Sequence, residues 1–206
     1  YLAGHSQVMF AKQPALELGG YCEQRRYSQD YELWCRLIQV GEVVILPDIL
    51  LQHRMHDQRV SITKQSEQIA LSLAQSQRNI ASLIGESPSL EEVTDLRGLM
   101  LIPNYWYAFP ELRLPARRAA AMHRRLQQIY AVFIQKMGHD SVPADLALQI
   151  RSLIGKQFLC WMQHLSLKQS LFLKLRVLFY AWQWSPAQVI ANRRQILPAF
   201  LTKLRF

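Results

Sequence analysis

The hydrophobic and polar positions follow two different patterns on either side of about residue 62. Before it, two short apolar runs with β-branched or aromatic residues, 6–10 and 42–46, predict strands. Between them, residues 31–40 repeat apolar positions at helical spacing and predict a helix that Gly41 ends. We therefore expect residues 1–62 to be a piece of a mixed α/β domain.

From Thr63 onward nearly every stretch has helical periodicity. Residues 63–84 predict a first helix, and Ser89 with Glu92 has the spacing of a capping box that starts a second. Further helices are predicted over about 116–137, from about 143, after 166 and after 185, where Pro186 takes the first helical position. Residues 102–115 hold three Pro and four aromatic residues and predict a loop. The sequence thus predicts a mostly α-helical domain over 63–206.

The charge changes sign at the same place. The 206 residues carry a net charge of +9, but residues 1–62 have six basic and seven acidic side chains. After Asp145 there is no acidic residue at all, while nine Lys and Arg follow. We expect the second part to prefer an anionic partner such as a membrane surface, a nucleic acid or a phosphorylated substrate.

Composition narrows the class of protein. Half of the residues are hydrophobic, which argues against a disordered chain. The three cysteines, Cys22, Cys35 and Cys160, are odd in number and far apart, so we expect neither a disulfide framework nor a cysteine zinc site, and we expect a reducing compartment. No apolar run is long enough to predict a transmembrane helix.

Asp30 is the first candidate for chemistry. It stands where the predicted helix begins, and unpaired backbone N–H groups together with the helix dipole favour a carboxylate there. Such an acid can accept a proton from a substrate hydroxyl. A helix cap is a commoner role for an acid at this position, and the residues alone leave both roles open.

Two further segments carry weak signals. His53-Arg54-Met55-His56 follows the second apolar run, and on an extended chain its two imidazoles point to opposite faces. It fits a metal or phosphate site, and equally a solvated polar segment. Gly19-Gly20 permits a ligand to approach backbone N–H groups, but it also fits the end of a helix.

Taken in order, these segments resemble the second half of the catalytic domain of family 2 glycosyltransferases, which have the GT-A fold. The matching strings are GHSQVMF from Gly4, LGGY from Leu18, QDYELWCRL from Gln29 and GEVVILPDILLQHRMHDQRVS from Gly41. In that family a GGY turn precedes an acidic pair that opens a helix reading DxxLWxRL, and a strand followed by LP, LL and YRxH comes next. The resemblance covers residues 1–62.

The resemblance implies a role for each matching residue. Asp30 would be the general base that deprotonates the acceptor hydroxyl, and His56 would lie near the metal and the donor diphosphate. Donor and acceptor binding would fall to Gly19, Gly20, Trp34 and Arg54. The cofactor would be a divalent cation, Mn²⁺ or Mg²⁺, and the partners would be a nucleotide-sugar donor and a glycan or lipid-linked acceptor.

The sequence departs from the family pattern in three places. Gln29 stands where an acid is usual, and His53 stands where Tyr is usual. No DxD motif, which holds nucleotide and metal in that family, occurs in the 206 residues, and the chain begins with Tyr1 rather than Met. The resemblance therefore implies that a donor-binding half lies upstream and that this chain alone is inactive.

The segment 158–184 mixes basic residues with Trp, Phe and Leu. Lys168, Lys174 and Arg176 on one face, with apolar side chains on another, are typical of a helix on an anionic membrane. A helix bundle with the aromatic residues in its core explains the same pattern. We do not expect nucleic-acid binding, because no recognition motif accompanies the basic residues.

The sequence thus predicts an acceptor-side half of a GT-A domain over 1–62 and a helical extension over 63–206. The predicted function is an inverting sugar transfer from a nucleotide-sugar to an acceptor hydroxyl, in the cytoplasm or peripherally on the inner face of a membrane. The alternative is a non-enzymatic basic helical module that binds an anionic membrane or a partner protein.

Overall fold

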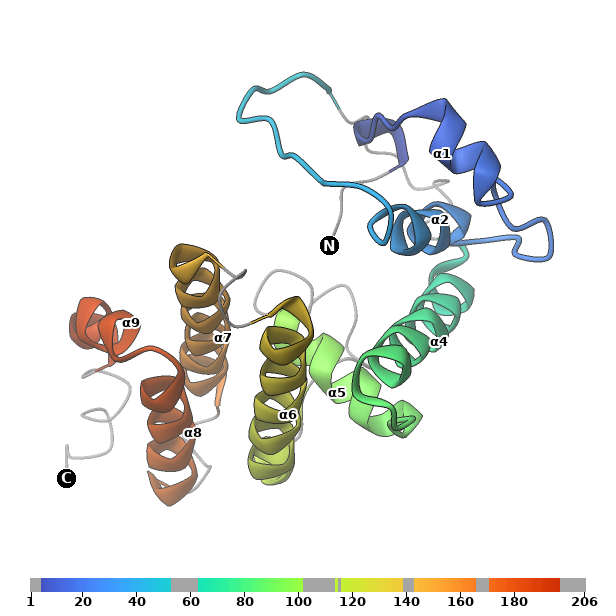
Figure 1. Ribbon diagram of the computed structural model, residues 1–206. Helices are drawn as coiled ribbons and strands as arrows, with labels where there is room; N and C mark the ends of the chain where they lie inside the picture. Colours follow the sequence, from blue (N-terminus) through green and yellow to red (C-terminus); the bar gives the residue numbers. More distant parts are fainter. Residues whose placement is uncertain are drawn as a thin grey trace. The chain divides into compact units, whose positions relative to one another are not determined.

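The computed structural model describes residues 5–52, 63–101, 114, 116–138, 143–165 and 171–196. Within these residues all regular structure is helical, and no strand is formed (Figure 1). The elements are η1 (His5–Gln7), α1 (Lys12–Glu17), α2 (Gln29–Leu37), α4 (Gln65–Ile84), α5 (Leu90–Met100), η3 (Ala116–Arg118), α6 (Ala119–Met137), α7 (Ala144–His164), α8 (Leu171–Trp184) and α9 (Pro186–Ala191).

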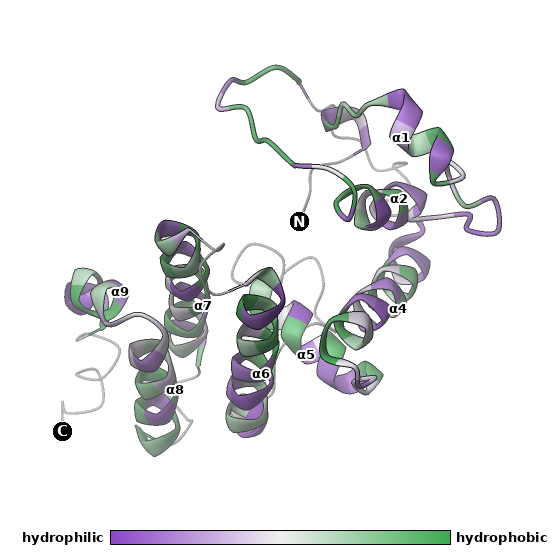
Figure 2. Ribbon diagram, viewed as in Figure 1, coloured by the Kyte–Doolittle hydropathy of each residue, from purple (hydrophilic) through white to green (hydrophobic). Residues whose placement is uncertain are grey.

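The predicted α/β fold class is therefore wrong. Of the two expected strands, residues 5–7 form the short helix η1, and 42–46 run as irregular backbone. Val44 and Ile45 are 78% and 86% exposed, and Figure 2 shows the stretch after α2 as largely hydrophobic. A strand forms only where its backbone groups pair with a neighbour, and no described segment pairs with this run.

Most of the helical predictions are confirmed, but the one over 31–40 is wrong about its end, because α2 stops at Leu37 and Gly41 lies beyond it. Ser89 accepts a hydrogen bond from the backbone N–H of Glu92, whose carboxylate accepts from the N–H of Ser89, so the capping box is complete. Gly138, with a φ of 78°, follows the last residue of α6. Pro186 begins α9, and the Ser185 hydroxyl before it accepts from the N–H of Gln188.

The chain divides into two compact units, Tyr1–Asn79 and Ile80–Phe206, and the boundary falls within α4. The division into 1–62 and 63–206 stays a prediction. In unit 1, α2 packs on the first part of α4, where the Tyr31 hydroxyl lies 3.2 Å from that of Ser76. Of the residues that the structure describes in unit 1, few apolar ones are buried: Ala15, Leu33, Trp34 and Leu73.

Unit 2 has a larger core, built mainly between α7 and α8. Arg151 donates to the carbonyl of Trp184, Phe158 contacts Tyr180, and Gly155 faces Ala181 and Ser185. Because residue numbers rise on one helix as they fall on the other, α7 and α8 are antiparallel. A Cβ at Gly155 would lie 2.9 Å from the Ser185 Cβ, so glycine permits this close approach.

Candidate functional site

Asp30 lies in the first turn of α2, as the sequence predicts. Its side chain is partly buried, and Oδ1 accepts a hydrogen bond of 2.8 Å from the backbone N–H of Tyr31. Within the described part of the chain it forms no ion pair. The carboxylate is thus held by backbone at a helix start while its remaining lone pairs can accept a proton.

The residue that caps α2 has an unusual backbone. Ser28 has φ 56° and ψ 27°, the only non-glycine residue with positive φ in the described part of the chain. Its hydroxyl donates to the carbonyl of Gln68 in α4 rather than capping α2. Left-handed backbone costs about 1 kcal/mol or more for a residue with a Cβ, and such strain gathers at functional sites.

Gly19 and Gly20 form the end of α1. Both have positive φ, 86° and 67°, and their N–H groups donate to the carbonyls of Leu16 and Ala15. This pair of bonds is a Schellman motif, in which glycine is favoured because it has no Cβ. Both backbone N–H groups already donate hydrogen bonds within the protein, so the geometry favours the helix-end explanation for the glycine pair. A ligand could not bind to these two N–H groups.

Arg36 joins this turn to α2. Its Nη2 donates to the carbonyl of Gly20 at 2.7 Å, and Nη1 donates to that of Leu18. The same guanidinium pairs with the carboxylate of Glu32, at 2.9 Å from Nε and 2.7 Å from Nη2. The hydrogen bond to Glu32 raises the pKa of Arg36, although burial acts the other way. Sequence reasoning assigned Arg36 no role.

The Arg36 clamp, meaning Arg36 with its bonds to Glu32, Leu18 and Gly20, therefore fixes the Gly-Gly turn against the helix that carries Asp30. The i, i+4 spacing of Glu32 and Arg36 was visible in the sequence. The carbonyl partners of Arg36, Gly20 and Leu18, lie 16 and 18 residues away, and the sequence did not reveal them.

Trp34 is a core residue of unit 1. It is 5% exposed beside the fully buried Leu33, and its Nε1 has no hydrogen-bond partner among the described residues. A buried indole N–H without a hydrogen-bond partner costs about 1–3 kcal/mol of stability, and such groups are uncommon in folded proteins. The contact with an acceptor that the resemblance implies stays a prediction.

Arg54 and His56 lie outside the described residues. Within the described ones, no group of three or more His, Cys, Asp or Glu could hold a metal ion. The residues that the structure describes thus do not fit a metal centre, and the divalent cation stays a prediction.

In unit 2 the basic and apolar residues of α8 are arranged differently from the expectation. Lys174 is 3% exposed and lies on the buried face with Val177, Ala181 and Trp184, so it is not part of an outer basic face. The opposite face of α8 is apolar too: Phe172, Leu175, Phe179 and Trp182 are 45–70% exposed. Arg176 lies over the Phe172 ring, 5.8 Å from its centroid.

Two buried titratable groups also lie in unit 2. Burial lowers the pKa of His123, which stacks on Tyr180 and accepts a hydrogen bond of 3.1 Å from Trp184 Nε1. Burial raises the pKa of Asp95 to about 6, against the pull of Arg118 at 3.0 Å. Both side chains are buried, His123 among aromatic rings and Asp95 in its ion pair with Arg118.

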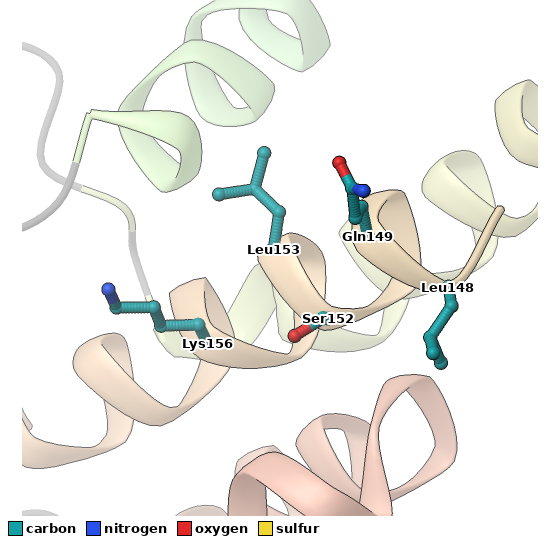
Figure 3. A pocket seen from close by; sticks show the side chains of 5 residues that line it. All are labelled: Leu148, Gln149, Ser152, Leu153 and Lys156. Carbon is teal, nitrogen blue, oxygen red and sulfur yellow. The ribbon is translucent and has the colours of Figure 1, made fainter. Parts of the chain in front are cut away.

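A shallow hollow of about 390 Å³ lies along α7 (Figure 3). Its lining consists of Leu148, Gln149, Ser152, Leu153 and Lys156. The Ser152 hydroxyl already accepts from Gln188, and the lining has one cation and no acid or imidazole. The hollow therefore offers no acid–base pair for catalysis.

No family model, curated protein or solved structure matches this chain. Within the described residues, none of the helices combines the length and apolarity needed to span a bilayer.

Proposed function

We propose that this protein serves the transfer of a sugar from a nucleotide-sugar donor to an acceptor hydroxyl, with Asp30 as the general base. The observation that carries the proposal is the Arg36 clamp, which holds the Gly19-Gly20 turn against the helix bearing Asp30. These are the segments whose order along the chain resembles family 2 glycosyltransferases. The clamp supports the idea that their order reflects one spatial site.

Of the described residues, the proposed reaction needs only Asp30 to take part in proton transfer. The acceptor hydroxyl gives its proton to the Asp30 carboxylate as its oxygen attacks the anomeric carbon, and the bond from that carbon to the diphosphate breaks. Because the acceptor attacks opposite the leaving group, the anomeric centre is inverted.

The strained start of α2 also supports the proposal. Ser28, two residues before Asp30, keeps a left-handed backbone although a relaxed cap was available to a serine. Its bond to Gln68 ties this start to α4. Anchoring the start of the helix restricts the backbone that carries Asp30, and a positioned catalytic group requires such restriction.

The test is nucleoside diphosphate release from a panel of nucleotide-sugars by the full-length protein that the gene encodes. Asp30→Asn keeps the shape and loses the base, so we expect turnover to fall about 10²–10⁴-fold with donor binding unchanged. Glu23→Gln removes an exposed acid of the same unit and serves as the matched control, with wild-type turnover. Wild-type protein that turns over no nucleotide-sugar, or full activity in Asp30→Asn, would overturn the proposal.

A further inference from the structure

The helix α8 of unit 2 is apolar on two opposite faces. One face is buried against α7 and carries Val177, Ala181 and Trp184. The other carries what we name the outer stripe, Phe172, Leu175, Phe179 and Trp182, spaced so that all four project to one side. Helices of a water-facing bundle normally bear polar residues there, so the outer stripe needs an explanation.

The exposure of the outer stripe is large for its residue types. Phe172 is 70% exposed and Phe179 is 56% exposed, whereas Phe158 on α7 is fully buried. Leaving such rings in water forgoes the stabilisation that burial gives a large apolar side chain. Figure 2 shows that most positions along α8 are hydrophobic.

Charge decides which occupant fits. Arg176 lies beside the outer stripe over Phe172, and Arg193 and Arg194 are exposed near the end of α9. After Asp145 the chain has nine Lys and Arg and no acid. A second copy of this chain would bring the same positive charge to the stripe and be repelled, whereas an anionic lipid surface offers opposite charge and an apolar interior.

The side chains of the outer stripe also suit a lipid interface. Phe and Leu partition into the acyl boundary, and Trp lies at the level of the headgroups, where its ring is apolar and its N–H is wet. Arg176 can reach lipid phosphates while its stem covers apolar surface. We propose that the outer stripe, with Arg176, binds unit 2 to the surface of an anionic membrane, lying in the interface and not crossing it.

This inference is independent of the proposed sugar transfer, because none of its residues belongs to unit 1. The test is co-sedimentation of the full chain with vesicles of phosphatidylglycerol and phosphatidylcholine in equal parts, against vesicles of phosphatidylcholine alone. We expect binding to the anionic vesicles only, and its loss at about 1 M salt, where the Debye length is about 3 Å.

Phe172→Gln/Phe179→Gln removes the two most exposed rings of the outer stripe, and we expect binding at least about tenfold weaker. The control is Leu90→Gln/Met137→Gln, which removes exposed apolar side chains of the same unit on α5 and α6, and it should bind as wild type does. Circular dichroism and thermal melting check that both variants fold as wild type. Arg176→Gln should weaken binding to anionic vesicles as well.

Three results would overturn the inference. The first is wild-type protein that ignores anionic vesicles or binds neutral ones equally well. The second is an outer-stripe variant that binds as tightly as the control. The third is a wild-type dimer in sedimentation velocity that becomes monomeric in the outer-stripe variant, because the stripe would then be covered by a second copy of the chain.

Discussion

The two units differ in how many of their apolar side chains they bury. Unit 2 encloses a continuous core in which Phe158, Trp161 and Met162 are almost wholly buried. Among its described residues, unit 1 buries only the apolar side chains of Ala15, Leu33, Trp34 and Leu73, and it leaves Val44 and Ile45 in water. The polar bonds around Arg36 therefore carry a larger share of the stability of unit 1, whereas unit 2 depends more on packing.

The difference teaches where each unit is vulnerable. A packed core resists the loss of one polar bond but not a side chain that does not fit. A unit with a small apolar core loses more stability when one of its polar bonds, such as those of Arg36, is removed. Four substitutions separate the two cases, and hydrogen exchange of individual peptides reports the stability of each unit in the full chain.

The largest effect is expected at Gly155. In Gly155→Val the new Cβ would lie 2.9 Å from the Ser185 Cβ and 3.3 Å from the Ala181 carbonyl oxygen, so α7 and α8 must separate. We expect the free energy of unfolding of unit 2 to fall by about 3 kcal/mol. Exchange in unit 1 should not change. Gln149→Val, on the exposed side of the same helix, controls for helix propensity, and equal losses in both variants would refute the tight contact.

The second effect tests the Arg36 clamp. Arg36→Met leaves the carboxylate of Glu32 and the carbonyls of Leu18 and Gly20 without their donor, and we expect unit 1 to lose about 2 kcal/mol. Unit 2 should keep its exchange rates. Arg26→Met, an exposed arginine of unit 1, should cost less than about 0.5 kcal/mol. Similar exchange in the two variants would show that the clamp does not hold unit 1.

The third effect is a pH dependence confined to unit 2. The pKa of Asp95 is about 6 in the folded chain against an ordinary 3.8, so folding favours its protonated form. The stability that Asp95 contributes to the folded state is fully present below pH 3.8 and is lost as the pH rises through about 6. Asp95→Asn should remove this loss, and the stability difference between variant and wild type should change by about 1–2 kcal/mol between about pH 4 and 6. A constant difference would contradict the assignment.

The smallest effect is expected at Gly20. A Cβ there meets no atom within 4 Å, so Gly20→Ala costs only the strain of its positive φ, about 1 kcal/mol in unit 1. Gly41→Ala is the matched control, because its Cβ would meet only the Leu37 carbonyl at an ordinary 3.7 Å. Equal stability of the two variants would argue against the Schellman end of α1.

The helices could be predicted because their signals are local. The Ser89–Glu92 capping box, Gly138 and Pro186 act within one turn of the helix ends that they mark. The strands could not, since composition says which residues suit a strand but not whether a partner is present to pair with them. Residues 42–46 are an example: they have the β-branched composition of a strand, but no segment in the described part of the chain forms backbone hydrogen bonds with them as a neighbouring strand would.

The candidate site was predictable to a similar extent. Asp30 at the start of α2 follows from the sequence, but the bonds from Arg36 to Leu18 and Gly20 depend on how a loop returns. On α8 the sequence could not distinguish the buried from the exposed side, because both are apolar. That is why Lys174 was expected on the surface and lies in the core.

The most direct test compares sugar transfer and membrane binding in the same two variants of the full-length protein. We predict that Asp30→Asn loses nucleoside diphosphate release about 10²–10⁴-fold and still sediments with anionic vesicles. The outer-stripe variant Phe172→Gln/Phe179→Gln should release nucleoside diphosphate in free solution as wild type does, and should no longer sediment with anionic vesicles. Undiminished release in Asp30→Asn would contradict the claim that unit 1 carries the chemistry.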